Sequence, residues 1–310
     1  MKILVTGGAG FIGSHIVEAL LKKGYSVRVL DNLSTGKREN LSRVMDEIDF
    51  VKGDITNIDT VQKVCEDIEG IIHLAAISSV PESIKNPEKV KSINVDGTLN
   101  ILEVAKKFNI KRVVYSSSAS VYGDNEEKLN ERTKLNPLSP YACSKLQSEK
   151  YMELFSKKSV ETICLRYFNV YGPKQNPLSN YSGVITIFIN KMLKGEAPII
   201  YGDGSNTRDF VFVEDIVNAN ILALEKKDYN FKIYNIASGK SISLKNLTQL
   251  LNKLLEENLQ PIYAEKRLGD ILNSSSDISL AQNELGWKPK VSFEEGLKKT
   301  LKYFLKNSGD

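Results

Sequence analysis

The chain of 310 residues has only three cysteines, Cys65, Cys143 and Cys164, and only two histidines, His15 and His73. The cysteines are odd in number and widely separated, so they predict neither a disulfide framework nor a metal-binding cluster. A histidine-based zinc site is not expected from two distant histidines. We therefore expect no metal and a reducing, cytoplasmic environment.

Long apolar runs and blocks of like charge are also lacking. No apolar stretch approaches the ~20 residues that a membrane-spanning helix needs, and the chain starts with a strand pattern instead of a signal-peptide pattern. The formal net charge is only +4 and the lysines are spread out, whereas a nucleic-acid-binding face needs a basic cluster. We expect neither a membrane nor a nucleic acid as partner.

What the chain does have is an alternation of short apolar segments and longer amphipathic ones. The composition, 41% hydrophobic and 26% charged, is that of a globular protein. Short β-branched strands separated by helices are typical of βαβ units with a parallel sheet covered on both faces. The expected strands are Lys2–Thr6, Ser26–Asp31, Asp49–Lys52, Gly70–Leu74, Arg112–Ser117, Glu161–Arg166 and Lys232–Ile236, and the expected helices include Ser14–Lys23, Val90–Phe108, Tyr141–Lys157 and Glu214–Leu224.

This alternation weakens after Phe168, where glycine and proline become frequent, and resumes for one helix and one strand. We predict an α/β fold, a doubly wound parallel sheet of the Rossmann type with a smaller C-terminal substrate-binding lobe. The nucleotide-binding domain is expected over residues 1–168 plus about 209–238, and the lobe over 169–208 plus 239–310. Residues 241–310 are expected to form helices and loops.

The first expected strand is followed by a glycine-rich segment, Gly7-Gly8-Ala9-Gly10-Phe11-Ile12-Gly13, and then by a helix. A strand–loop–helix context of this kind indicates a loop that binds dinucleotide phosphates. Gly7 allows a tight turn, Gly10 lets the backbone approach the pyrophosphate, and Gly13 permits close packing of helix and strand. A glycine-rich turn without a ligand is the alternative, for which the context gives little support.

Acidic residues at two strand ends indicate which dinucleotide is bound. Asp31 lies about 20 residues beyond the glycines, where a carboxylate hydrogen-bonds the adenosine ribose and repels a 2′-phosphate. This position predicts NAD instead of NADP, although Asp31 could simply open the Asn32–Gly36 turn. Asp54 could contact the adenine amino group, or it could equally be a turn residue.

A serine-rich strand end and a later helix start carry the candidate catalytic side chains, Ser118, Tyr141 and Lys145. Tyr141 and Lys145 are four residues apart and so share a helix face, where the ammonium would lower the tyrosine pKa from about 10. The phenolate could then take a proton from a sugar hydroxyl while hydride leaves the same carbon, with Ser118 bonded to that hydroxyl. Singly, these features usually indicate a half-buried ring, a solvated amine or a turn; in this order after a dinucleotide loop, they favour catalysis.

Together these segments resemble the extended short-chain dehydrogenase/reductase family, and within it the UDP-sugar 4-epimerases. The resemblance implies an NAD-dependent isomerase that interconverts UDP-glucose with UDP-galactose, and UDP-GlcNAc with UDP-GalNAc, through a transient 4-keto sugar. The segments that carry it span nearly the whole chain in family order: Thr6–Gly13, Asp31-Asn32, Asp54-Ile55, His73–Ala76, Asn94, Ser116–Gly123, Tyr141–Lys145, Arg166–Gly172, Arg208-Asp209 and Arg267–Asp270.

The resemblance also implies roles for single residues, with catalysis by Ser118, Tyr141 and Lys145. Arginines suit the UDP diphosphate because their planar donors match phosphate oxygens, although an isolated arginine is more often in a surface ion pair. The residues expected to contact NAD are Gly7, Gly10, Phe11, Ile12, Gly13, Asp31, Asn32, Asp54, Ile55, Leu74, Ala75, Ala76, Asn94, Ser116, Tyr141, Lys145 and Phe168. Those expected to contact the UDP-sugar are Ser79, Ser118, Tyr141, Asn169, Arg208, Arg267, Asp270 and Ser274.

Two segments bear on the reaction and on the sugar. Family 4,6-dehydratases have an Asp-Glu pair where this chain has Ser118-Ala119, and the decarboxylases generally have a glutamate in this loop, so the loop resembles the epimerase form. In the family, the residue four beyond the Asp of the Arg-x-Gly-Asp segment bounds the sugar pocket. That residue here is the small Ser274, which predicts that N-acetylated sugars are accepted; Leu268 departs from the proline of many relatives.

Helices 90–108 and 141–157 have apolar residues on more than one face. They could be buried within the monomer, or they could pair in the four-helix contact of a homodimer, as in family dimers. Two rival functions stay open, namely UDP-glucuronate decarboxylation or epimerisation on the same scaffold and a non-catalytic NAD-binding regulator. Ser118-Ala119 disfavours the first, and the presence of both Tyr141 and Lys145 disfavours the second.

Overall fold

Parallel strands form the main sheet of the computed structural model, which describes residues 1–125, 127–158, 160–177, 183–227, 229–265 and 274–307. The strand order β10-β6-β5-β4-β1-β2-β3 shows that the chain winds outward from β1 in one direction and from β4 in the other. All six neighbouring pairs are parallel, so the predicted doubly wound Rossmann-type fold is confirmed. The strands are β1 Lys2–Thr6, β2 Ser26–Asp31, β3 Ile48–Lys52, β4 Gly70–His73, β5 Arg112–Ser118, β6 Glu161–Tyr167 and β10 Phe231–Ile236.

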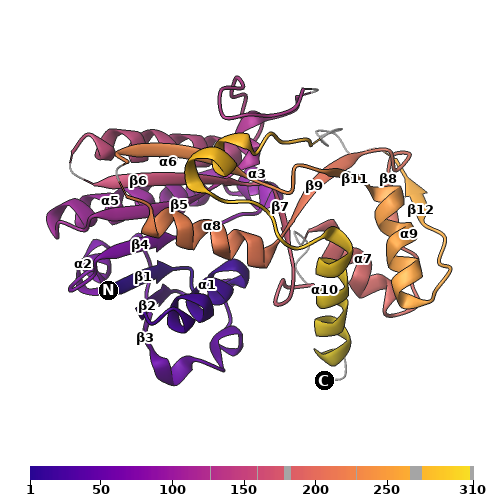
Figure 1. Cartoon of the computed structure of the whole chain (residues 1–310), viewed down its shortest axis with the longest axis horizontal. Coiled ribbons are helices and arrows are strands. Elements are labelled where there is room, and N and C mark those ends of the chain that lie inside the picture. The colour runs from indigo at the N-terminus through magenta and orange to yellow at the C-terminus, as the bar shows by residue number, and fades with distance from the viewer. Residues whose placement is uncertain (126, 159, 178–182, 228, 266–273, 308–310) are drawn as a thin grey trace.

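Helices cover both faces of this sheet (Figure 1). Because side chains alternate along a strand, Ile3 and Val5 of β1 pack into one core cluster, whereas Leu4 packs into the cluster on the other side. The first cluster includes side chains of α1 and α8, and the second includes those of α2, α5 and α6. These helices are α1 Phe11–Lys22, α2 Ile58–Val64, α5 Gly97–Lys107, α6 Pro140–Ser156 and α8 Val213–Glu225.

The helix expected at 90–108 is helical throughout but not regular. After α3 (Val80–Lys85), it consists of α4 (Pro87–Lys91), a π-helical turn η3 (Ser92–Asp96) and α5. The carbonyl of Asn94, within that turn, accepts hydrogen bonds from the Thr98 and Ser148 hydroxyls at 2.6 and 3.0 Å. Side-chain hydroxyls thus donate hydrogen bonds to a backbone carbonyl in the turn where the regular helical hydrogen-bond pattern is interrupted.

The smaller lobe contains two small sheets, in the orders β11-β9-β7 and β12-β8. The expectation of only helices and loops after residue 241 was wrong, because β11 and β12 lie there. Each has three residues, too few to show a periodic pattern, and each forms by pairing with an earlier strand of the lobe. The lobe elements are β7 Asn169–Tyr171, α7 Val184–Met192, β8 Ile199–Tyr201, β9 Thr207–Phe212, β11 Ser241–Ser243, α9 Leu244–Leu255, β12 Ile262–Ala264 and α10 Phe293–Asn307.

The chain crosses between the two units at places that differ from those expected. Residues 209–212 belong to β9 of the lobe, so the return to the main sheet begins with α8. Conversely, the segment from Ile278 to Trp287 belongs to the core of the main unit, although it was expected in the lobe. The Trp287 side chain is fully buried, and its Nε1 donates to the carbonyl of Asp215 in α8 at 2.9 Å.

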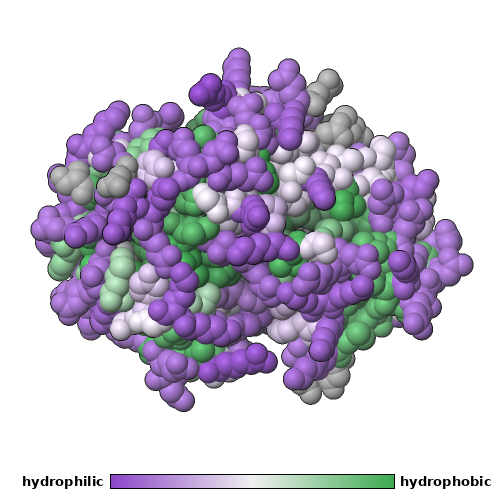
Figure 2. Space-filling view, viewed as in Figure 1, coloured by the Kyte–Doolittle hydropathy of each residue, from purple (hydrophilic) through white to green (hydrophobic). Residues whose placement is uncertain are grey.

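Hydrophilic side chains dominate the face shown in Figure 2, and hydrophobic ones are visible mainly in recesses between them. Of the helices that the structure describes, none is both long enough and apolar enough to cross a membrane.

Candidate active site

The glycine loop connects β1 to α1 at the carboxyl edge of the main sheet. The helix begins at Phe11, earlier than expected, and Gly10 is its extended N-cap residue (φ −75°, ψ 179°). None of the described side chains caps this helix start by a hydrogen bond. A Cβ on Gly13 would lie 2.2 Å from the Gly7 oxygen, and one on Gly7 would lie 2.8 Å from the Ala75 nitrogen. This backbone cradle, with a helix start that no described side chain caps, fits a dinucleotide pyrophosphate.

Asp31 links the end of β2 to the glycine loop. Its Oδ2 accepts from the Ala9 amide at 2.9 Å and its Oδ1 from the Leu33 amide at 2.8 Å. Burial raises the pKa of this carboxyl, and the two amides act in the opposite direction. Asp31 therefore does open the turn at 32–36, and it does so beside the nucleotide loop; its contact with the ribose stays a prediction.

Asn32, Asp54 and Ile55 are engaged with the protein itself. Asn32 Nδ2 donates to Asp54 Oδ2 at 2.7 Å, and Asp54 Oδ1 accepts from the amide and hydroxyl of Thr56 at 2.9 and 2.8 Å. Although burial acts to raise the pKa of Asp54, these bonds outweigh it and lower the pKa. The Ile55 side chain is in the core against Gly97. These contacts support the turn role of Asp54, and the NAD contacts of all three stay predictions.

His73, at the end of β4, connects β1 to the π-helical turn. Its Nδ1 lies 2.7 Å from the Thr6 hydroxyl and its Nε2 lies 2.9 Å from the Thr98 hydroxyl. Because the Thr98 hydroxyl donates to the Asn94 carbonyl, it must accept from His73, which assigns the Nε2–H tautomer. Burial lowers the pKa of His73 to about 3, so the ring is neutral near pH 7.

Asn94 holds the loop after β4 against α6. Its Oδ1 accepts from the Ile77 amide at 2.8 Å, and its Nδ2 donates to the Ile77 carbonyl at 2.9 Å and to Ser144 Oγ at 3.0 Å. Both hydrogens of the amide are therefore used within the protein. Asn94 thus has a positioning role in the protein itself, and its contact with NAD stays a prediction.

The start of α6 brings the candidate catalytic residues to the end of β5. Pro140 stands in the first helical turn and Ser139 caps it by accepting from the Ala142 amide at 3.1 Å. The Tyr141 hydroxyl lies close enough to the Ser118 side chain for the serine hydroxyl to act on its pKa. Lys145 Nζ donates to the Ser116 carbonyl at 2.7 Å. The structure thus brings the serine, tyrosine and lysine of the prediction together.

The electrostatics of this pair differ from the expectation. Burial raises the pKa of Tyr141, and the Ser118 side chain only partly opposes this effect. Burial also lowers the pKa of Lys145 to about 7. The Lys145 nitrogen lies 5.9 Å from the centre of the Tyr141 ring. The prediction that Lys145 lowers the tyrosine pKa was therefore wrong for the protein alone, because desolvation penalises the charged forms of both groups.

The other expected NAD contacts lie along the same edge of the sheet. Leu74, Ala75 and Ala76 follow β4, and the Ala75 amide donates to the Thr6 hydroxyl at 3.2 Å. Phe168 follows β6, with its ring centre 6.5 Å from that of Tyr122. Parallel strands place their carboxyl ends at one edge, and for this reason residues so distant in sequence converge.

The expected sugar contacts fall into three groups. Asn169 and Arg208 line one cavity in the lobe, and Ser274 is tied to the same strand as Arg208 because its amide donates to the Thr207 carbonyl at 3.2 Å. Ser79 caps α3 by accepting from the Glu82 amide at 3.0 Å. Arg267 and Asp270 lie outside the described residues.

Sequence reasoning missed Glu149, which forms a buried ion pair with Arg166 beside the candidate catalytic residues. Its spacing was a usable signal, because Tyr141, Lys145 and Glu149 follow one another at intervals of four and therefore share a helix face. Among the described residues, no three His, Cys, Asp or Glu side chains gather closely enough to hold a metal ion.

The fold and site define a class of protein, an α/β enzyme with a dinucleotide loop and a serine–tyrosine–lysine site. The sequence matches the NAD dependent epimerase/dehydratase family over residues 3–237, and the chain belongs to that family. It is an NAD-dependent enzyme of the epimerase type, as predicted.

Solved structures and curated relatives agree with this assignment. The UDP-glucose 4-epimerase of Thermotoga maritima, solved with UDP-glucose, is 41% identical over 99% of this chain and 100% of its own, with a TM-score of 0.95. The UDP-N-acetylglucosamine 4-epimerase of Methanobrevibacter ruminantium, solved with UDP-N-acetylmuramic acid, is 40% identical over 99% and 98%, with a TM-score of 0.94. The UDP-glucose 4-epimerase of Mycolicibacterium smegmatis is 37% identical over 99% of this chain and 100% of its own.

Proposed function

We propose that this enzyme is a UDP-hexose 4-epimerase that interconverts UDP-glucose with UDP-galactose and also UDP-GlcNAc with UDP-GalNAc, with tightly bound NAD. The observation that carries the proposal is the convergence of Ser118, Tyr141 and Lys145 at the edge that carries the glycine loop. Ser118-Ala119 supplies no acidic pair for dehydration, and the similar structures contain UDP-sugars.

In the proposed reaction, Tyr141 removes the proton from the C4 hydroxyl and Ser118 hydrogen-bonds the same oxygen. Bound NAD would supply a reversible acceptor for the C4 hydride, and its oxidised ring would add positive charge to the site. Breaking the C4–H and O–H bonds would form a C4 carbonyl, and the keto sugar would then turn to present its other face. The C4–H bond would re-form on that face, which inverts C4, while the O–H bond re-forms on the same oxygen. Tyr141 then gives the proton back, so no net oxidation occurs and the cofactor is regenerated in each cycle.

The residues that would hold the cofactor and the substrate lie in different units. We propose that the main unit holds NAD through the Gly7–Gly13 loop, Asp31 and Lys145. The lobe would hold the UDP diphosphate through Asn169 and Arg208, which share one cavity. Guanidinium donors suit phosphate oxygens because they bind them in pairs. Arg267 and Asp270 would complete this site.

A direct test incubates the purified enzyme, without added NAD, with UDP-glucose and separately with UDP-GlcNAc. NMR resolves the C4 epimers, and we expect an equilibrium mixture from both sugars. Failure to convert either sugar, with NAD also supplied, would overturn the proposal. The second candidate is 4-epimerisation of UDP-glucuronate, favoured by a relative of that name; turnover of UDP-glucuronate alone would establish it.

Ser274 should decide whether N-acetylated sugars are accepted. Its side chain is buried, as is that of Ser276, whereas Ser275 between them is half-buried, as expected for an extended segment with alternating side chains. We expect Ser274→Tyr to lower kcat/KM for UDP-GlcNAc by at least about tenfold, since about 1.4 kcal/mol of lost transition-state binding suffices, and to spare UDP-glucose. Ser275→Tyr is the matched control, and equal loss for both sugars would contradict the proposed role.

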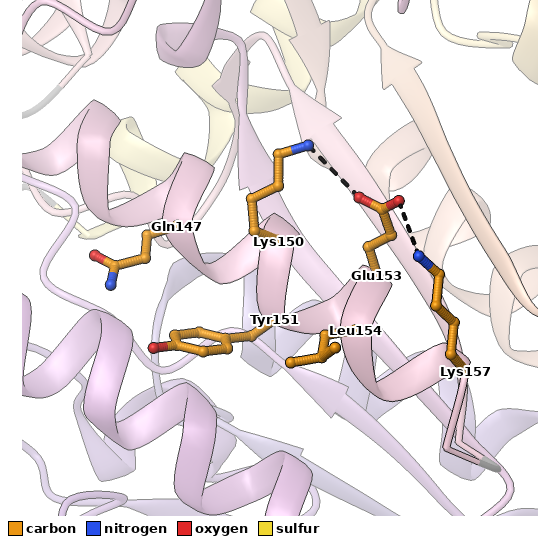
Figure 3. A pocket seen from close by; sticks show the side chains of 6 residues that line it. All are labelled: Gln147, Lys150, Tyr151, Glu153, Leu154 and Lys157. Carbon is orange, nitrogen blue, oxygen red and sulfur yellow. Dashed lines mark ion pairs between the residues drawn. The ribbon is translucent and has the colours of Figure 1, made fainter.

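We also propose that the enzyme forms a homodimer through the outer face of α6. Figure 3 shows Tyr151 and Leu154 on this face beside the ion pairs of Glu153 with Lys150 and Lys157. Leu154 is 45% exposed and lies beside Tyr151, so this face carries apolar surface that a second copy could cover. A four-helix contact between two copies, as in the family, would bury it.

Leu154→Glu should therefore convert the dimer into a monomer, because it would place a carboxylate in a desolvated contact. Light scattering after size-exclusion chromatography measures the mass. Leu305→Glu, which alters an exposed leucine at the far end of the chain in α10, should leave the mass unchanged. A Leu154→Glu protein that stays dimeric would exclude this face as the interface.

A cytoplasmic location is proposed from the cysteines. Cys65, Cys143 and Cys164 are all free thiols, and the first and last are buried in the core. Free thiols are typical of a reducing compartment.

A further inference from the structure

Three residues on one face of α6, Tyr141, Lys145 and Glu149, point toward β5 at intervals of four residues. All three are nearly inaccessible, with 9%, 3% and 2% of their surfaces exposed. The proposed chemistry uses the first two. Glu149 is a carboxylate buried more deeply than either of them, and its function is unexplained by proton or hydride transfer.

The end of β5 lies against this face residue by residue. Ser118 lies near Tyr141 and acts on its pKa, and the Ser116 carbonyl accepts from Lys145 Nζ at 2.7 Å. Ser117, between them, donates its hydroxyl to Glu149 Oε1 at 2.5 Å. The Glu149 carboxylate thus anchors the end of β5, which carries both Ser118 and the Ser116 carbonyl that binds Lys145.

Arg166 on β6 pairs with Glu149 in this dry environment. Its Nε and Nη2 donate to the two carboxylate oxygens at 2.8 and 2.7 Å, and its Nη1 donates to the Tyr122 hydroxyl at 2.8 Å. Arg166 is itself only 1% exposed. A bidentate pair of this kind has the geometry that compensates for the loss of water around both charges.

The groups around Lys145 show what this carboxylate does there. Besides Tyr141 on its own helix, the ammonium faces Tyr115 of β5 at 4.8 Å from the ring centre. Two further groups lie near the ammonium. Cys164 of β6 acts to raise the pKa of Lys145, and Lys145 in turn acts to lower the pKa of His73 of β4. Burial raises the pKa of Tyr115 and Cys164 and lowers that of His73, so all three are neutral at pH 7.

From this geometry we infer that Glu149 and Arg166 form a positioning pair, in which Glu149 places a carboxylate one helical turn from Lys145 and holds Ser116–Ser118 in register with α6. The inference rests on the proposed function, because it concerns the same lysine. Burial acts to remove the proton from Lys145 and lowers its pKa to about 7, and Glu149 acts most strongly in the opposite direction. Without the carboxylate, the ammonium would lose its proton at a lower pH.

The test follows the protonation of Lys145 directly in the NAD-containing enzyme. The ¹³Cε signal of labelled lysine is titrated by NMR and assigned by its loss in Lys145→Met. In Glu149→Gln we expect the midpoint to fall by about one pH unit or more. At pH values above the wild-type midpoint, the ammonium fraction and kcat should fall about tenfold for each unit.

Two further variants keep the result interpretable. Glu149→Gln leaves Arg166 buried without a partner and could unfold, so Glu149→Gln/Arg166→Met removes both charges, a change that buried ion pairs often tolerate. Glu149→Asp keeps the charge and should restore the midpoint, though not full kcat. Glu161→Gln is the matched control, because Glu161 pairs with Arg112 where β5 and β6 begin, whereas the candidate site lies where these strands end.

An unchanged Lys145 midpoint in the folded double variant would overturn the inference, as would an equal fall in Glu161→Gln. Because the titration needs no substrate, a failure to epimerise UDP-sugars would overturn the proposed function without affecting this readout.

Discussion

Tyr141→Phe should lower kcat for UDP-sugar epimerisation by about two to four orders of magnitude, the usual contribution of a positioned acid–base group. Phenylalanine fills the same buried space, since Tyr141 is only 9% exposed, and it removes only the hydroxyl, which lies near Ser118. The fold and the bound NAD should therefore be retained. Steady-state kinetics with both UDP-glucose and UDP-GlcNAc measures the effect.

Tyr303→Phe serves as the control for this experiment, because it makes the same chemical change on α10, away from the candidate site. Absorbance of the purified protein establishes that each variant carries NAD. A Tyr141→Phe enzyme that keeps more than about a tenth of the wild-type rate would show that another group transfers the proton.

The second large effect is expected for Gly13→Ala. The added Cβ would lie 2.2 Å from the Gly7 oxygen and 2.8 Å from the Gly8 Cα, and both of these are backbone atoms that cannot rotate away. The glycine loop must therefore move, which should destabilise the protein by about 3 kcal/mol or more and abolish the retention of NAD. Thermal unfolding and the amount of NAD that copurifies measure the two consequences.

Gly24→Ala separates crowding from the general cost of replacing glycine. Gly24 has a positive φ of +83° and no atom within 4 Å of its hypothetical Cβ, so only backbone strain of about 1–3 kcal/mol is expected, with NAD retained. If Gly13→Ala kept its full content of NAD, the close packing of loop and helix would not be required for cofactor binding.

Tertiary contacts add to what the motifs suggested. Asn94 joins Ile77 to Ser144 within the protein, and its expected contact with NAD stays a prediction. The Tyr141–Lys145 spacing correctly predicted a shared face, but the predicted pKa effect was wrong. Spacing reports which side chains are neighbours, whereas the pKa depends on how much water and which charges the rest of the fold leaves around them.

By itself, the sequence determined the alternation of strands and helices, the doubly wound sheet, the glycine loop and the shared face of Tyr141 and Lys145. These features follow from local periodicity and from backbone sterics, which act over a few residues. Only the tertiary structure decided the Glu149–Arg166 pair, the strands β11 and β12, and the return of Trp287 to the main core. Each of these depends on partners far apart in the chain, where pairing and desolvation outweigh local preference.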